Sequence, residues 1–209
     1  MTNRRGLFVT FEGGEGSGKT TQCELLALRL RAGGWNVIHA REPGGTRLGE
    51  EIRRLLLHPE EPLGVETELL LFLTARAELV RSVIKPALDE GGAVICDRFS
   101  DSTFAYQGYG RGLDLETVRR LNDFATGGLV PDLTVLLDLP SDAGLARKGD
   151  DDDAFQREDD SFHDRVNAGY LALAQAEPER WLVLDATAPP HELAQAIAAH
   201  VERLHSGLQ

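Results

Sequence analysis

The sequence has little of what several protein classes require. It contains only two cysteines, Cys23 and Cys96, and they lack the spacing of a metal-binding pair. The six histidines include no His-x-x-x-His pair, so no zinc site is expected. Apolar runs are too short to cross a bilayer, which argues against a membrane protein. Isolated cysteines favour buried, reduced thiols, as in a cytoplasmic protein.

Positive charge is also scarce. Lysine and arginine total 22 against 34 aspartates and glutamates, which gives a net charge of −12. Nucleic acids and anionic membranes need a basic face, so neither is expected as a partner. The short stretch before the first apolar run leaves no room for a signal peptide, which again favours the cytoplasm. If the ligand carries phosphates, the few cations must gather at its site.

One segment carries a complete phosphate-binding motif. Gly13–Thr20 reads Gly-x-x-x-x-Gly-Lys-Thr, between the apolar run Leu7–Phe11 and the Leu- and Ala-rich stretch Gln22–Arg31. Strand, glycine loop and helix in this order form a cradle of backbone N–H groups at a helix N-terminus. Lys19 is then expected to reach the β- and γ-phosphates, and the Thr20 hydroxyl to ligate Mg²⁺.

The remaining pattern predicts an α/β fold. Four more short apolar runs follow the first, at residues 36–40, 93–96, 133–137 and 181–184. They alternate with helical stretches, which predicts a five-stranded parallel sheet with helices on both faces. A long helix is expected over 65–88, stopped near Pro86 and the glycines at 91–92, and a last one around 193–204. No linker or repeat divides the chain, so residues 1–209 are expected to form one domain.

Charged residues follow two of the predicted strands. Ligands gather where parallel strands end, so these residues are candidates for a site. Arg41 precedes a Glu-Pro-Gly-Gly-Thr turn, whose glycines allow close approach of a ligand. Asp97 suits a Mg²⁺ shell, and Arg98 beside it can grip a phosphate with its planar fork. The alternatives are a plain turn for the first segment and a surface ion pair for the second.

Neutral and aromatic groups suggest a second site for a nucleoside. Phe72 and Arg76 lie one helical turn apart, so a ring and a guanidinium share one face. Residues 102–108 combine two hydroxyls, a tyrosine and a glutamine within a turn or two. Taken singly, Phe72 is more often a core residue and Arg76 more often a solvated charge, and the polar groups of residues 102–108 could serve in helix capping.

Taken together, these segments resemble the thymidylate kinase family. The matching stretches are residues 11–21, 41–46, 70–76, 83–88, 97–108, 131–134 and 184–187, in order over nearly the whole chain. The resemblance implies a P-loop kinase fold with a mobile lid at about residues 147–160. It also implies an enzyme of nucleotide biosynthesis, which uses ATP and Mg²⁺ to phosphorylate dTMP to dTDP on the way to dTTP. Members of the family are usually homodimers.

The resemblance further implies roles for individual residues. The ATP site would comprise Gly13, Gly14, Glu15, Gly16, Ser17, Gly18, Lys19, Thr20, Thr21 and Ala186. Residues that act in transfer would be Lys19, Glu15, Arg41, Arg98, Arg157 and Arg147, and Thr20 and Asp97 would hold the metal. The acceptor site would comprise Glu42, Pro43, Phe72, Arg76, Arg98, Thr103, Tyr106 and Gln107.

Several of these acceptor contacts are specific. By resemblance, Glu15 would face the 3′-hydroxyl of the deoxyribose and Phe72 would stack on thymine. Arg76 would hydrogen-bond the O4 atom of the base, which Thr103 would also contact. Tyr106 would crowd the 2′ position and so favour deoxyribose. Arg98 would hold the acceptor phosphate, and Gln107 would close over it.

The lid departs from the family pattern. The phosphate loop has Gly16 where some members have arginine, and such members usually carry the charge in the lid. Here Ala154 occupies the usual lid arginine position, after four consecutive aspartates at residues 150–153. We expect these aspartates to face water, and Arg157, then Arg147, to turn toward the phosphates.

Two other functions compete with this interpretation. One is another nucleoside or nucleotide kinase built on the same cradle. The other is a regulatory P-loop ATPase or partition-type switch, which needs no second nucleotide pocket. A GTP switch is disfavoured because the chain has no Asn-Lys-x-Asp guanine-binding motif. A pocket for a nucleoside monophosphate beside the phosphate loop would favour a kinase.

Overall fold

The fold is built on a parallel sheet of five strands, as the sequence predicts. The computed structural model describes residues 5–140, 143–144 and 153–207. The strands are β1 (Leu7–Glu12), β2 (Val37–Arg41), β3 (Ala93–Asp97), β4 (Leu133–Asp138) and β5 (Trp181–Asp185), in the spatial order β2-β3-β1-β4-β5. Every predicted strand is therefore confirmed, to within a residue or two at its ends.

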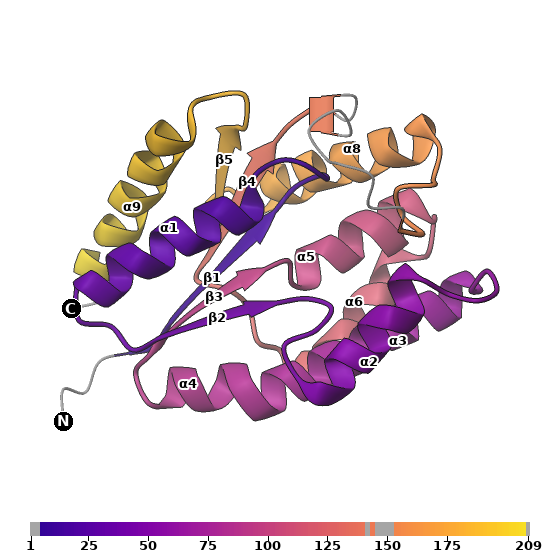
Figure 1. Cartoon of the computed structure of the whole chain (residues 1–209), viewed down its shortest axis with the longest axis horizontal. Coiled ribbons are helices and arrows are strands. Elements are labelled where there is room, and N and C mark those ends of the chain that lie inside the picture. Colours follow the sequence, from indigo (N-terminus) through magenta and orange to yellow (C-terminus); the bar gives the residue numbers. More distant parts are fainter. Residues whose placement is uncertain (1–4, 141–142, 145–152, 208–209) are drawn as a thin grey trace.

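Helices cover both faces of this sheet (Figure 1). Helices α1 (Lys19–Ala32) and α9 (Pro190–Gly207) lie together on one face. The other face carries α2 (Arg47–Leu57), α3 (Val65–Leu79), α4 (Lys85–Asp89), α5 (Ser100–Thr103), α6 (Leu115–Thr126) and α8 (Asp160–Ala176). The segments η1 (Val80–Ile84) and η2 (Phe104–Gly110) are π-helical. Within the described chain, no helix has the length and apolar character needed to cross a membrane.

The long helix predicted over residues 65–88 is confirmed, and it passes through Pro86 before it ends. It runs without a break from α3 through η1 into α4, which ends at Asp89. Proline lacks a backbone N–H, and its ring crowds the preceding turn of a regular helix. Here the wider π-turn precedes it, and the Lys85 N–H bonds the Val80 carbonyl five residues back. The helix therefore continues through a residue that usually ends one.

The sheet register brings the candidate residues to one edge. β1 lies between β3 and β4, and Phe11 on β1 pairs with Asp97 on β3. Asp97 also pairs with Arg41 on the neighbouring β2. The phosphate loop, Asp97 and Arg41 therefore leave the sheet side by side, at the carboxyl ends of adjacent strands.

The two cysteines are buried free thiols, as expected. Cys23 lies on α1 and Cys96 on β3, and both are fully buried. Burial raises the pKa of each thiol well above its usual value. Both side chains therefore act as small apolar groups of the core.

Candidate active site

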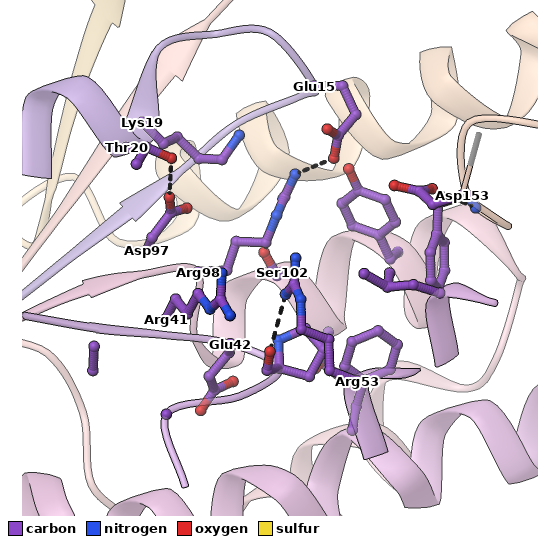
Figure 2. A pocket seen from close by; sticks show the side chains of 18 of the residues that line it. Glu15, Lys19, Thr20, Arg41, Glu42, Arg53, Asp97, Arg98, Ser102 and Asp153 are labelled. Atoms are coloured by element: carbon purple, nitrogen blue, oxygen red, sulfur yellow. Dashed lines mark hydrogen bonds and ion pairs between the residues drawn. The ribbon is translucent and has the colours of Figure 1, made fainter. Parts of the chain in front are cut away.

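A single pocket of about 770 Å³ opens at this edge of the sheet (Figure 2). One end is formed by the phosphate loop and the start of α1, and the other by side chains of α3, α5 and η2. Sixteen of the residues proposed from the sequence line it: Glu15, Gly16, Gly18, Lys19, Thr20, Thr21, Arg41, Glu42, Pro43, Phe72, Arg76, Asp97, Arg98, Thr103, Tyr106 and Gln107. The phosphate loop and the nucleoside candidates thus share one cavity.

The phosphate loop requires glycine at residue 16. Gly16 has a φ of 65°, in the left-handed region that glycine adopts most readily. A Cβ atom there would also collide with the backbone carbonyl oxygen of Gly144. An arginine at this position, as in some family members, would therefore have to displace the chain around Gly144.

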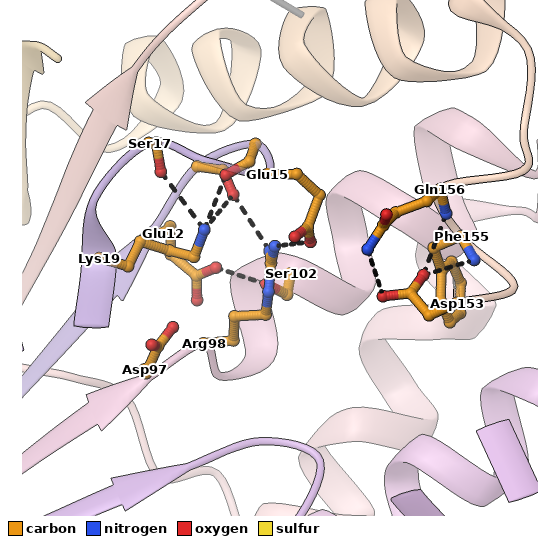
Figure 3. A network of polar contacts seen from close by, with 12 residues as sticks. Glu12, Glu15, Ser17, Lys19, Asp97, Arg98, Ser102, Asp153, Phe155 and Gln156 are labelled. Atoms are coloured by element: carbon orange, nitrogen blue, oxygen red, sulfur yellow. Dashed lines mark hydrogen bonds and ion pairs between the residues drawn. The ribbon is translucent and has the colours of Figure 1, made fainter. Parts of the chain in front are cut away.

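Lys19 is held inside the loop by backbone oxygen atoms. Its Nζ atom donates to the carbonyls of Gly14 at 2.7 Å and Gly13 at 3.2 Å, and to the Ser17 hydroxyl at 3.3 Å (Figure 3). Burial, followed by the nearby charge of Arg98, lowers the pKa of Lys19 to about 8. The buried ammonium is thus short of compensating negative charge, which the phosphates of a nucleotide would supply.

Two oxygen ligands suited to Mg²⁺ lie beside this lysine. The Thr20 hydroxyl donates to Asp97 Oδ2 at 2.7 Å, so both groups point to the same spot at the pocket wall. Mg²⁺ is commonly bound in nucleotide sites by one or two protein oxygens, with phosphates and water completing the shell. Among the described residues no group of three or more histidines, cysteines or acidic residues could form a dedicated metal site. The oxygens of Thr20 and Asp97 therefore suit a Mg²⁺ ion that binds together with a nucleotide.

Arg98 links the two ends of the pocket. Its Nη2 atom lies 2.7 Å from Glu15 Oε1, and its Nη1 atom donates to Gly13 O at 3.1 Å and to the Tyr170 hydroxyl at 3.1 Å. Its guanidinium lies 5.1 Å from the centre of the Tyr106 ring. The residue has a φ of 69°, which a non-glycine residue adopts only under constraint. The β3–α5 turn thus aims this guanidinium at the phosphate loop.

A buried carboxylate supports the turn that carries Arg98. Glu12 is fully buried and accepts from the Phe99 N–H at 2.8 Å and the Ser102 hydroxyl at 2.6 Å (Figure 3). It also accepts from the Tyr170 hydroxyl at 3.1 Å. Burial, followed by the nearby Asp101 carboxylate, raises the pKa of Glu12 to about 7. Glu12 therefore ties the end of β1 to the segment that presents Arg98.

The acceptor end combines aromatic rings with buried polar atoms. Phe72 and Tyr106 line it, and burial raises the pKa of the Tyr106 phenol to about 12, so it stays neutral. Thr103 Oγ1 and Glu42 Oε1, both from pocket residues, are buried without a hydrogen-bond partner in the described part of the chain. Buried polar atoms normally find a partner, so these two fit a ligand that bonds them.

Arg76 is more deeply engaged than the sequence suggests. It is 1% exposed, and its Nε atom donates to Glu42 at 2.7 Å. Its Nη1 atom donates to Asn122 Oδ1 and its Nη2 atom to the Phe99 carbonyl, both at 3.0 Å. Three of its N–H groups thus hold the pocket wall together, while the residue still borders the cavity. The expected contact with a base would use the remaining N–H groups.

Some predicted residues lie outside the cavity lining. Gly13, Gly14 and Ser17 belong to the loop and accept hydrogen bonds from Lys19 without lining the cavity, and Ala186 follows β5 in the apolar core. Arg157 is exposed on the turn before α8. Arg147 and three of the four aspartates fall outside the described residues. The fourth, Asp153, lines the pocket and accepts N–H bonds from Phe155 and Gln156, so it does not simply face water.

The sequence interpretation missed several lining residues, notably Arg53, Leu57 and Phe155. Arg53 donates to the Pro43 carbonyl at 3.0 Å, and burial followed by the Arg41 charge lowers its pKa. Arg53 and Leu57 are four apart on α2, so helical spacing from the glycine turn could have indicated their face. Phe155 could have been identified as a buried residue, because it is a large apolar side chain within an acidic stretch.

Comparisons with known proteins agree with this geometry. A family model described as thymidylate kinase matches residues 11–197. A thymidylate kinase of Thermomicrobium roseum is 55% identical over 197 residues, which cover 93% of each chain. A thymidylate kinase of Deinococcus radiodurans is 53% identical, covering 96% of this chain and 99% of that one.

The chain belongs to the thymidylate kinase family. A crystal structure of thymidylate kinase from Ehrlichia chaffeensis superimposes with a TM-score of 0.74 at 41% identity, covering 86% of this chain and 93% of that one. The expected P-loop kinase fold is thereby confirmed. So is the expected class of activity, because membership makes the chain an ATP-dependent kinase of dTMP.

Proposed function

We propose that this chain transfers the γ-phosphate of ATP to dTMP with Mg²⁺ bound, in the cytoplasm, and so supplies dTDP for dTTP synthesis. The observation that carries the proposal is the single cavity that joins the phosphate loop to a nucleoside pocket. A kinase must bring two anionic substrates into line and neutralise their charge, and covalent help from the protein is not needed. A nucleotide switch has no use for the second half of this cavity.

At the donor end, the chain's own groups hold the triphosphate. The first turn of α1 has no side-chain cap, because Gly18 occupies the N-cap position. Its N–H groups and those of the loop would therefore bind the phosphates of ATP. Lys19 exchanges its bonds to the loop carbonyls for phosphate oxygens. Thr20 and Asp97 would hold Mg²⁺, which supplies charge neutralisation between the phosphates when bound.

At the acceptor end, Phe72 provides a flat apolar surface for the base, and Thr103 a hydroxyl at its edge. Tyr106 leaves little room beside the sugar, and an added 2′-hydroxyl would lose water there without gaining a partner. Arg98 and Arg53 present guanidinium groups where the acceptor phosphate would meet the donor. Glu15, which pairs with Arg98, would accept a hydrogen bond from the 3′-hydroxyl.

We propose that the positive charge that stabilises the phosphate during transfer comes chiefly from residues outside the lid. Four cations line the phosphate end of the pocket: Lys19, Arg41, Arg53 and Arg98. Arg157 and Arg147 remain proposed contributors from the lid. If they act in the transition state, the Arg147→Ala, Arg157→Ala double variant should lower turnover at saturating substrates more than it changes the Michaelis constants. Full turnover in that variant would show that the four cations outside the lid neutralise the phosphate charge in the transition state.

The acceptor assignment has a direct test. Release of ADP is measured with ATP, Mg²⁺ and a panel of nucleoside monophosphates. We expect dTMP to have the highest kcat/KM, well above AMP, CMP and GMP. Equal use of any of these three would instead favour a broader nucleoside monophosphate kinase.

We also propose that the chain forms a homodimer. Support comes from exposed apolar side chains on three adjoining helices: Leu55 on α2 is 56% exposed, Leu70 on α3 53% and Phe124 on α6 91%. A second copy of the chain would bury them. Light scattering should give twice the mass of one chain, and Leu70→Glu should shift the protein toward monomer. A monomeric wild-type protein would contradict the proposal.

A further inference from the structure

Phe155 forms an aromatic contact with two residues of the acceptor end. It is 6% exposed although it lies in a turn, and it lines the pocket. Its ring centre lies 5.8 Å from that of Phe72 and 5.8 Å from that of Tyr106, edge-on to the tyrosine. A large apolar side chain in an acidic surface loop would ordinarily add little to the core. The burial of Phe155 against two acceptor residues therefore requires an explanation.

The turn that carries Phe155 is tightly fixed. Asp153 Oδ1 accepts from the N–H groups of Phe155 at 2.9 Å and Gln156 at 3.0 Å, and its Oδ2 atom accepts from the Gln156 side chain (Figure 3). The Ala154 N–H donates to the carbonyl of Leu57, at the end of α2, at 2.9 Å. Backbone bonds on both sides thus fix the direction of the Phe155 ring.

A single arginine ties this turn to an acceptor residue. Arg111 donates through Nη1 to Glu158 at 2.6 Å, and through Nε and Nη2 to the two oxygens of Glu68, at 3.2 and 2.9 Å. Glu68 also accepts from the Gln107 side chain at 2.9 Å. The Arg111 guanidinium lies 5.8 Å from the centre of the Phe155 ring and 4.7 Å from that of Phe162, which does not line the pocket. The fork therefore joins the loop behind Phe155 to the residue expected to cover the acceptor.

We propose that Phe155 is a specificity residue for the acceptor, forming a third aromatic wall around the deoxynucleoside, and that Arg111 positions it. This inference rests on the proposed dTMP kinase activity. Phe72, Tyr106 and Phe155 enclose the nucleoside from three elements, and the last wall comes from the turn before α8. An apolar wall binds the base and sugar equally in the ground state and the transition state, so its loss weakens acceptor binding more than it slows transfer.

The test compares two phenylalanines. Phe162 is also buried and packs edge-on against Tyr106 at 6.0 Å, but it does not line the pocket. Phe155→Leu should raise the KM for dTMP about threefold and Phe155→Ala about tenfold, the range for lost apolar contacts in a pocket. The kcat and the KM for ATP should stay within about twofold. Phe162→Leu should change the melting temperature without changing the KM for dTMP.

A second comparison tests Arg111. Arg111→Lys keeps the charge but loses the planar fork, and it should raise the KM for dTMP with little change in kcat. Arg119→Lys is the matched control, because Arg119 also lies over a phenylalanine ring, but that ring, Phe104, does not line the pocket as Phe155 does. Phe155→Ala should also narrow the preference for dTMP over its ribose analogue, 5-methyluridine monophosphate.

The outcomes separate the two proposals. A wild-type enzyme that ignores dTMP overturns the proposed function itself. A wild-type enzyme that uses dTMP, with Phe155→Leu and Phe155→Ala showing an unchanged KM for dTMP and an unchanged ribose preference, overturns the role of Phe155. If Phe155→Ala fails to fold, Phe155→Leu decides by the same criterion. Equal rises in the KM for ATP and for dTMP would also overturn the role of Phe155, since they would indicate that the whole pocket has lost its packing.

Discussion

The two ends of the pocket are assembled in different ways. The phosphate end is built around one continuous stretch, Glu15–Thr21, from the loop after β1 and the start of α1, to which Arg41, Arg53 and Arg98 add positive charge. The acceptor end draws on α2, α3, α5, η2 and the turn before α8, which are far apart in the sequence. The first depends on local backbone geometry, and the second on how the helices pack. Substitutions should therefore abolish transfer at one end and shift selectivity by degrees at the other.

The largest effect is expected for Lys19→Ala. Lys19 meets charge that develops in transfer, so its loss should lower kcat about a thousandfold. Binding of dTMP, measured by calorimetry, and the melting temperature should change little. Lys85→Ala, at an exposed position on α4, is the control. Near-normal turnover of the Lys19 variant would remove this lysine from the mechanism.

Arg98→Lys should come next, with a fall of about a hundredfold in kcat/KM for dTMP. Lysine keeps the charge but cannot reach Glu15, Gly13 and Tyr170 at once, and each bond to a charged group contributes about 1.5–3 kcal/mol. Arg29→Lys is a matched control, because Arg29 pairs with Glu202 at the same 2.7 Å as Arg98 with Glu15, but on the surface. A loss of similar size in both variants would contradict a special role for Arg98.

Glu12→Gln tests the buried carboxyl that supports the Arg98 turn, through the pH dependence of the unfolding free energy. The folded protein holds the Glu12 proton up to about pH 7, whereas the unfolded chain releases it near 4.5. Between these values the folded state binds more protons, so this group makes the wild type less stable as pH rises. From pH 5 to pH 8 the wild type should lose about 2 kcal/mol of unfolding free energy relative to the variant.

The measurement is urea denaturation of both proteins at several pH values. Glu66→Gln, on the exposed face of α3, is the control and should show no such change relative to the wild type. If the difference between wild type and Glu12→Gln stays constant with pH, the Glu12 carboxyl does not titrate in this range.

The smallest effect is expected at the acceptor end. Tyr106→Ala should narrow the preference for deoxyribose over ribose acceptors by about tenfold, because it opens room beside the sugar. The ratio of kcat/KM for dTMP and 5-methyluridine monophosphate measures this. Tyr106→Phe keeps the ring and should keep the ratio. An unchanged ratio in Tyr106→Ala would assign the selectivity elsewhere.

The contrast between the two ends also explains what the sequence could predict. The five strands and the Gly13–Thr20 loop were predictable because each depends on neighbours in the chain, through burial and glycine geometry. The helix over residues 65–88 was predicted to within one residue of its end, but the π-turn that lets it continue through Pro86 was not, because the sequence pattern alone does not reveal how a clash is relieved. Local patterns cannot reveal partners set by packing.

The acceptor end shows the same limit. Phe72 and Tyr106 were proposed through the family resemblance. Taken singly, Phe72 is more often a core residue, and the segment with Tyr106 could serve in helix capping. Arg53 was missed beside Arg54, although its helical spacing with Leu57 on α2 offered a signal for which of the two arginines faces the cavity. Phe155 was missed because its role depends on Arg111 and Leu57, which are distant in the chain. The aspartate run was judged as one unit, although Asp153 has its own bonds to the turn.

The central claim is that one continuous cavity binds both substrates. It is tested most directly by calorimetric titration with a ligand that joins adenosine and thymidine, 5′ to 5′, through a chain of phosphates. We predict one molecule bound per chain, more tightly than ATP or dTMP alone, with both nucleotides displaced competitively. Two molecules bound per chain, or displacement of only one of the two nucleotides, would contradict the claim.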